Sequence, residues 1–298
     1  MDPITFDGKV AIVTGAGGGL GRQHALLLAS RGARVVVNDL GGAVDGTGSS
    51  AGPAKAVVDE IIAAGGEAVA DGSSVATAEG GEAMVNAALS AFGRIDIVIN
   101  NAGILRDKSF ANMTDDLWDA VVDVHLRGAM CVTRAAWPHM KAQGYGRVVS
   151  TSSAAGIFGN FGQANYGAAK MGLVGFTRVL AAEGAKSNIK VNAISPVART
   201  RMTEEILGPL AEKLDPGLVS PVVAWLAHED CPVTGEVYSV GGGRVARIFI
   251  GEGPGFAKVD LTPEDVRDQF EVIRSQEGYQ TPRNANEEVA LVMASFPR

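Results

Sequence analysis

The chain has 298 residues, of which 46% are hydrophobic and 20% charged, a composition typical of a globular protein that excludes a disordered or fibrous one. Its 26 lysine and arginine residues against 33 aspartate and glutamate residues give a net charge of −7, and no basic run occurs, so nucleic acid is not expected as a partner. No secretory leader and no apolar run of membrane-spanning length are present, so we expect a soluble, cytoplasmic protein without a membrane partner. Cys131 and Cys231 stand far apart, which predicts neither a disulfide nor a metal site.

Short β-branched segments alternate with longer alanine-rich segments over the first 243 residues. Predicted strands cover residues 9–14, 34–38, 67–70, 95–100, 147–150, 190–194 and 236–240, and predicted helices cover residues 20–30, 54–64, 79–92, 115–142, 166–186 and 220–227. Parallel strands need a crossover of about a dozen residues, and right-handed crossovers place helices on both faces of a sheet. We therefore expect an α/β fold, a Rossmann-type doubly wound parallel sheet of about seven strands, as a single domain at residues 1–243.

Residues 244–298 form a C-terminal extension with a different pattern. Thr262 followed by Pro263 and two acidic residues predicts the start of a helix, and another short helix is expected near Asn286. The extension is too short for a core of its own, so we expect it to pack on the main domain or on a partner subunit.

A glycine-rich turn, TGAGGGLG at residues 14–21, follows the first predicted strand and opens the first helix. Such a turn lets the backbone approach a pyrophosphate, while the helix N-terminus offers free N–H groups. The residues expected to contact a dinucleotide there are Gly15, Gly19, Leu20 and Gly21. The alternative is an ordinary tight turn, but the strand, turn and helix context favours nucleotide binding.

Asp39 directly follows the second predicted strand, 18 residues past Gly21. An acid at this place accepts hydrogen bonds from the adenosine ribose and repels the 2′-phosphate of NADP, so NAD is the predicted cofactor. The alternative role is a cap after the strand. Asn101, Ala102 and Gly103 follow the fourth strand at the carboxyl edge, where they either admit a ribose or simply end the strand.

Tyr166 and Lys170 are four residues apart and therefore share one face of a predicted helix. A nearby ammonium group lowers the pKa of a phenol, so the spacing predicts that Tyr166 is a usable proton acceptor. Ser153, thirteen residues before Tyr166, follows the fifth strand, and its hydroxyl can hold a substrate oxygen. A tyrosine and a lysine at this spacing, taken alone, usually lie on the protein surface without a function. Their position after a serine-rich strand end and downstream of a nucleotide-type turn favours a catalytic role.

Together with the segment at residues 195–200, these motifs resemble those of the short-chain dehydrogenase/reductase family, in order and spacing, over residues 6–243. The resemblance implies that Tyr166 is the general acid and base, that Lys170 also binds the nicotinamide ribose, and that Ser153 positions the substrate. It further implies a nicotinamide carboxamide site after the sixth strand and an adenine site after the third. The residues concerned are Pro196, Val197, Ala198 and Thr200 for the carboxamide, and Ser74 and Val75 for the adenine.

Two positions depart from the family pattern. His125 stands where the family usually has an asparagine that helps to hold a water in a proton relay to the lysine. His125 either takes that role, through a ring nitrogen or its backbone carbonyl, or is a hydrogen-bonded core histidine. Ser73 replaces the acid that often meets the adenine amino group, which puts that contact in doubt.

Four stretches, at residues 37–42, 100–107, 124–128 and 159–166, resemble the (3R)-hydroxyacyl-CoA dehydrogenases of the peroxisomal multifunctional enzymes type 2. The resemblance implies NAD-dependent oxidation of a (3R)-3-hydroxyacyl-CoA to a 3-oxoacyl-CoA. Alternatives are a hydroxysteroid or other secondary-alcohol dehydrogenase and, from a different class, an inactive nucleotide-binding regulator. Because no hydratase or carrier segment is present, we expect a stand-alone dehydrogenase.

Substrate recognition is less defined in the sequence. Residues 104–114, 154–165 and 200–219 follow strand ends on the catalytic side and are expected to border the substrate pocket. Arg106, Lys108 and Arg201 either meet the phosphates of coenzyme A or are solvated surface charges. The family resemblance also implies a homodimer or homotetramer.

Overall fold

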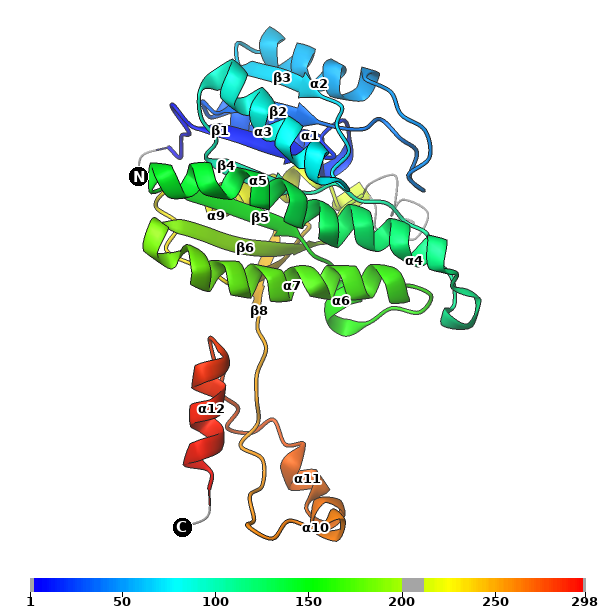
Figure 1. Cartoon of the computed structure of the whole chain (residues 1–298), viewed down its shortest axis with the longest axis vertical. Helices are drawn as coiled ribbons and strands as arrows, with labels where there is room; N and C mark the ends of the chain where they lie inside the picture. Colours follow the sequence, from blue (N-terminus) through cyan, green and yellow to red (C-terminus); the bar gives the residue numbers. More distant parts are fainter. Residues whose placement is uncertain (1–2, 200–211, 297–298) are drawn as a thin grey trace. The chain divides into compact units, whose positions relative to one another are not determined.

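The structure is a computed structural model that describes residues 3–199 and 212–296. The described residues form a sheet of eight strands in the order β3-β2-β1-β4-β5-β6-β7-β8 (Figure 1). The strands are β1 (Val10–Thr14), β2 (Arg34–Asn38), β3 (Glu67–Asp71), β4 (Ile97–Asn100), β5 (Gly146–Thr151), β6 (Ile189–Pro196), β7 (Val237–Gly241) and β8 (Arg244–Ile248). Strands β1 to β7 pair in parallel, which confirms the predicted doubly wound fold.

Helices cover both faces of the sheet. They are α1 (Gly19–Ser30), α2 (Gly52–Ala63), α3 (Ala78–Phe92), α4 (Asp115–Val122), α5 (Gly128–Gln143), α6 (Ala154–Phe158), α7 (Ala164–Gly184) and α9 (Ser220–Ala227). Alternate residues of β1 face opposite cores: Ala11 and Val13 pack with α1, α2 and α9, whereas Val10 and Ile12 pack with α3, α5 and α7. Burial on both faces explains why the central strands are almost wholly apolar.

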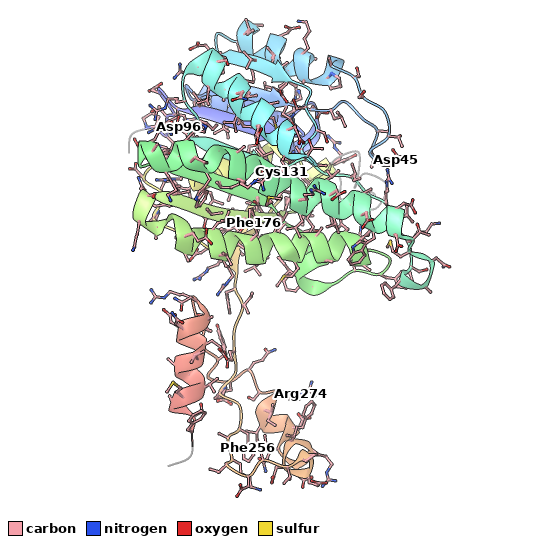
Figure 2. The ribbon with its side chains drawn as sticks, in the orientation of Figure 1. Asp45, Asp96, Cys131, Phe176, Phe256 and Arg274 are labelled. Atoms are coloured by element: carbon pink, nitrogen blue, oxygen red, sulfur yellow. The ribbon has the colours of Figure 1, made fainter. Side chains whose placement is uncertain are left out.

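The strand order reverses between β1 and β4, and the turns that follow these two strands are joined. The Thr14 hydroxyl oxygen accepts hydrogen bonds from the backbone N–H groups of Asn101 and Ala102, both at 3.0 Å. Ligands of open α/β sheets bind at such a switch point, outside the carboxyl ends of the strands. In Figure 2 this edge lies on the side of Asp45, opposite Asp96, which directly precedes β4.

Not every element follows the sequence-based expectation, and the short helices α6 and α11 were not predicted. The helix predicted over residues 115–142 is α4 and α5 separated by a π-helical segment, η2 (Asp123–Arg127), which contains His125. Strand β8 was not predicted; it follows β7 through a two-residue turn, Gly242 and Gly243, with φ of 56° and 79°. Two consecutive residues with positive φ form the turn that joins antiparallel strands, which glycine adopts readily.

The chain divides into two compact units, residues 1–247 and 248–298. The second unit contains α10 (Pro263–Asp268), α11 (Phe270–Ile273) and α12 (Ala285–Ala294). Thr262 and Asp265 form the capping box that starts α10, where the sequence predicted a helix start. How the extension packs stays a prediction. Among the helices that the structure describes, none is long and apolar enough to span a membrane.

Candidate active site

A cavity of about 790 Å³ lies at the carboxyl edge of the sheet. It is lined by most of the residues predicted to bind cofactor or substrate: Gly15, Gly19, Leu20, Asp39, Ser74, Val75, Asn101, Ala102, Gly103, His125, Ser153, Tyr166, Lys170, Pro196 and Ala198. Gly21 and Val197 are not among the lining residues, and Thr200 and Arg201 lie outside the described part of the chain. The volume is that of a typical small-molecule site.

The glycine-rich turn is held against the residue that follows β2. The Asp39 carboxylate accepts hydrogen bonds from the N–H groups of Gly17, at 2.8 Å, and Gly41, at 2.7 Å. A Cβ atom on Gly17 would lie 2.6 Å from Cβ of Pro53, and one on Gly21 would lie 2.3 Å from the Gly15 carbonyl oxygen. Gly17 therefore permits close approach to Asp39, and Gly21 permits close packing of α1 on the turn.

The N-terminus of α1 is free to bind an anion. Its N-cap is Gly18, no side chain caps the helix, and its first turn contains no acidic residue. Unpaired N–H groups and the positive end of the helix dipole then face the pocket, as a pyrophosphate requires. With the Asp39 carboxylate at the end of the next strand, the turn fits a dinucleotide.

An acid that sequence reasoning missed organises the segment after β3. Asp71 accepts hydrogen bonds from the N–H and hydroxyl of Ser73, at 2.9 and 3.1 Å, and from the side-chain amide of Asn38, at 2.7 Å. The position of Asp71 at the end of a strand was the signal that could have identified it. Because the Ser73 hydroxyl donates to Asp71, its oxygen is left as an acceptor for a donor in the pocket.

The three residues predicted to carry the reaction lie together. Ser153 is the N-cap of α6, where its hydroxyl accepts a hydrogen bond from the Ala155 N–H at 3.2 Å, and it lines the pocket together with Tyr166, which lies on α7. The Nζ atom of Lys170 donates to the Thr151 carbonyl at 2.6 Å and lies 5.4 Å from the centre of the Tyr166 ring. Asn165, which the sequence analysis did not identify, also fixes this region: its side-chain oxygen accepts from the Tyr166 N–H at 2.8 Å.

The pKa of Tyr166 is shifted in the direction opposite to the sequence-based expectation. Burial raises the pKa of Tyr166 above its usual value of 10, and the hydrogen bond with Ser153 opposes this only in part. Burial also lowers the pKa of Lys170 to about 7, because a charged amine is poorly solvated inside the protein. Lys170 therefore carries less positive charge at neutral pH than the spacing argument assumed.

His125 is buried beneath the loop that follows β4. Its Nε2 atom lies within hydrogen-bond distance of the backbone of Ile104, 3.1 Å from the nitrogen and 2.8 Å from the oxygen. Its ring meets the Tyr166 ring edge to face, with centres 5.1 Å apart. Burial, and then the charge of Lys170, lower the pKa of His125 well below 6.5, so the imidazole is neutral at physiological pH.

A second, small cavity of about 10 Å³ lies behind the catalytic residues, lined in part by Asn100, His125 and Lys170. Within the described ranges, neither the side-chain oxygen of Asn100 nor Nδ1 of His125 has a hydrogen-bond partner, and both atoms are buried. A polar cavity of this size has room for about one water molecule.

The chain was compared with known families and proteins. A family model described as short chain dehydrogenase matches residues 9–208. Peroxisomal multifunctional enzyme A of Dictyostelium discoideum is 49% identical over 293 residues, which cover 98% of this chain and 66% of that protein. A hydroxyacyl-CoA dehydrogenase of Mycobacterium tuberculosis is 40% identical over 292 residues, which cover 89% of each protein.

The structure is similar to that of full-length peroxisomal multifunctional enzyme type 2 from Drosophila melanogaster, with a TM-score of 0.81 and 40% identity over 98% of this chain and 49% of that one. The chain thus spans just under two thirds of the Dictyostelium relative and about half of the Drosophila protein. The match to a dehydrogenase family confirms the prediction of an oxidoreductase. Dehydrogenases of this family use NAD or NADP. With the family model covering well over half of its length, the chain belongs to the short-chain dehydrogenase family.

Proposed function

We propose that the protein is an NAD-dependent dehydrogenase that interconverts a (3R)-3-hydroxyacyl-CoA and a 3-oxoacyl-CoA. The observation that carries the proposal is that Ser153, Tyr166 and Lys170 meet at the wall of a pocket that also contains the glycine-rich turn. The substrate class is supported by the printed name of the Mycobacterium relative and by the multifunctional enzymes to which the chain is similar.

In this proposal Tyr166 accepts the proton of the substrate hydroxyl, and Ser153 holds the same oxygen. Bound NAD supplies the nicotinamide ring that accepts hydride from carbon 3. The N-terminus of α1 would hold the pyrophosphate, and Lys170 would hold the nicotinamide ribose. Pro196 and Ala198, which line the pocket, would hold the carboxamide. Most of the rate enhancement comes from orientation and from stabilising charge on the oxygen, and proton transfer contributes about 10² to 10⁴-fold.

The preference for NAD over NADP is assigned to Asp39. Its two oxygens already accept backbone hydrogen bonds, from Gly17 and Gly41, and this fixes the carboxylate at the pocket wall. Each oxygen keeps a second lone pair for a ribose hydroxyl. A 2′-phosphate at the same place would meet a fixed negative charge, which is unfavourable.

His125 is proposed to replace the usual family asparagine in the proton relay. The support is the small cavity, where the unpartnered Nδ1 of His125 and the side-chain oxygen of Asn100 lie near Lys170. A neutral imidazole nitrogen can hold a water there while Nε2 stays on the backbone of Ile104. The alternative, a purely structural histidine, is tested below.

Three further expectations belong to the proposal: a homodimer or homotetramer, packing of residues 244–298 on the main domain or on a partner subunit, and a cytoplasmic location. Light scattering of the full chain measures the subunit number, and cross-linking between the extension and α7 tests the packing. Fractionation of the source cell tests the location. A monomer whose extension cross-links to nothing would contradict the first two.

The experiment that tests the activity is a substrate panel. Purified protein is mixed with NAD and a (3R)-3-hydroxyacyl-CoA, its (3S) isomer, a hydroxysteroid or a short secondary alcohol, and NADH absorbance is followed. The proposal predicts the highest kcat/KM with the (3R) thioester. A higher kcat/KM with the steroid would favour a hydroxysteroid dehydrogenase, and no turnover of any substrate would favour a nucleotide-binding regulator.

A further inference from the structure

The loop between β2 and α2 forms part of the pocket wall. Its base is closed by a hydrogen bond from the Ser50 N–H to the Leu40 carbonyl, at 2.9 Å, and its tip by one from the Ala43 N–H to the Thr47 carbonyl, at 2.8 Å. Asp45 lies at this tip (Figure 2). Small residues near the tip, Gly42, Ala43, Val44 and Gly46, line the cavity.

The tip is fastened to the segment that follows β4. The Val44 carbonyl accepts from the Leu105 N–H at 3.0 Å, and the Asp45 carbonyl accepts from Nε of Arg106 at 2.9 Å. From the other side, the side-chain amide of Asn165 donates to the Arg106 carbonyl at 3.0 Å. Arg106 is therefore held by its backbone beside the catalytic helix and by its side chain at the loop.

The guanidinium group of Arg106 keeps two terminal nitrogens free. Arg106 lines the cavity, and no residue in the described ranges accepts a hydrogen bond from these nitrogens or forms an ion pair with them. The Asp45 carboxylate accepts hydrogen bonds from the N–H and hydroxyl of Thr47, at 3.0 and 2.7 Å, and the charge of Arg106 attracts it without a direct hydrogen bond. The N–H groups on the two terminal nitrogens of Arg106 are thus available to a ligand.

Arg106 is also distinguished by charge. Among the described residues that line the cavity, the cationic side chains are Arg106 and Lys170, and Lys170 is buried and bonded to the Thr151 carbonyl. A planar guanidinium with one N–H already anchored is suited to a phosphate, which it binds through two parallel hydrogen bonds.

We propose that Arg106 binds a phosphate of the coenzyme A part of the substrate and so distinguishes CoA thioesters from uncharged alcohols. The inference rests on the proposed function. The contacts of Arg106 place it in the pocket wall near the catalytic helix: its carbonyl accepts from Asn165, the neighbour of Tyr166, and its guanidinium donates to the Asp45 carbonyl.

Lys108 provides the matched control. It lies two residues further along the same segment, its side chain is exposed, and it is not among the residues that line the cavity. Its backbone N–H donates to the Gly162 carbonyl, an interaction that a side-chain substitution leaves in place. A general effect of positive charge on an anionic substrate would appear in both variants, whereas a direct contact would appear only at Arg106.

The test compares wild type, Arg106→Gln, Arg106→Lys and Lys108→Gln on one (3R)-3-hydroxyacyl group carried by four thiols: pantetheine, 4′-phosphopantetheine, 3′-dephospho-CoA and CoA. We expect Arg106→Gln to raise KM for the CoA thioester at least tenfold while kcat, KM for NAD and KM for the pantetheine thioester stay within twofold. Arg106→Lys should recover part of the affinity. The shortest phosphorylated thiol that shows the loss identifies the phosphate that is bound.

Each of the other possible results points to a different explanation. An equal rise in KM for all four thioesters would show that Arg106 only shapes the pocket, and a rise in KM for NAD would assign it to the cofactor; either result overturns the inference and leaves the proposed function standing. If Lys108→Gln raises KM as much as Arg106→Gln, the effect is long-range charge and the inference is also wrong. If wild type oxidises none of the thioesters, the proposed function itself fails.

Discussion

Lys170 and Tyr166 lie one turn apart on α7, with the Nζ atom of Lys170 5.4 Å from the centre of the Tyr166 ring. Both are buried, and burial acts against the charged form of each: the pKa of Lys170 falls to about 7, while that of Tyr166 rises above 10. The phenol therefore holds its proton at neutral pH. This state suits a proton donor, and it makes the two directions of the reaction respond differently to pH.

The first prediction is a pH dependence in one direction only. Alcohol oxidation needs Tyr166 without its proton, so kcat/KM for oxidation should rise with pH over the range from about 6 to 9, whereas ketone reduction, which uses the protonated phenol, should change little. Initial rates in both directions across this range are the measurement. An oxidation rate that is already level below neutral pH would show that Tyr166 loses its proton much more easily than its burial indicates.

A second prediction concerns Asp39. Replacing Asp39 with alanine removes the fixed carboxylate and the partners of the Gly17 and Gly41 N–H groups, so KM for NAD should rise and discrimination against NADP should weaken, each about tenfold. Asp39→Asn keeps an acceptor but loses the charge, so it should relax discrimination with a smaller loss of NAD affinity. The prediction is wrong if wild type already prefers NADP.

The third prediction separates the two roles of His125. His125→Asn, which restores the usual family residue, should keep substantial activity, whereas His125→Leu, which holds no water, should lower kcat at least tenfold. Melting temperatures of both variants control for folding, because both lose the contact of Nε2 with the Ile104 backbone. Wild-type kcat in a folded leucine variant would make His125 a structural residue only.

A fourth prediction links His24 to acid stability. His24 is buried, its Nδ1 atom is 2.8 Å from the Ser220 hydroxyl, and burial lowers its pKa from 6.5 to about 3. The unfolded chain binds this proton below pH 6.5 and the folded protein only near pH 3, so the free energy of unfolding should fall as the pH falls between these values. The contribution is on the order of 5 kcal/mol.

Replacing His24 with glutamine keeps a partner for Ser220 and removes the titrating group. Urea unfolding at several acidic pH values should then show a shallower fall in stability for His24→Gln than for wild type. If the free energy of unfolding falls equally with pH in the two proteins, His24 binds its proton equally well in the folded and unfolded states, and the prediction is wrong.

Much of the fold was predictable because its strands are buried on both faces. The segment Arg34–Asn38 and the helix Ser220–Ala227 occur with the predicted bounds, since apolar runs flanked by glycine or a helix-starting residue mark their ends. The π segment at residues 123–127 was missed because its residues continue a helical pattern. Strand β8 was missed because Gly242 and Gly243 were taken as the end of the domain, whereas they form a hairpin turn.

The candidate site was less accessible to sequence reasoning wherever it depends on contacts between distant segments. The spacing of Tyr166 and Lys170 could be read directly, because one helix carries both. The contact of Arg106 with the Asp45 carbonyl joins residues 61 positions apart, and no local sequence pattern predicts it. The raised pKa of Tyr166 was also hidden, since it follows from burial by the surrounding loops and not from the helix itself.

The most direct test of the central claim is the rate of NADH formation from a (3R)-3-hydroxyacyl-CoA by wild type and by Tyr166→Phe, with Tyr279→Phe as a control outside the pocket. The variant keeps the ring and loses only the hydroxyl, so kcat should fall at least a hundredfold while the dissociation constant for NAD changes little. Wild-type turnover by the phenylalanine variant would contradict the assignment of Tyr166 as the proton acceptor.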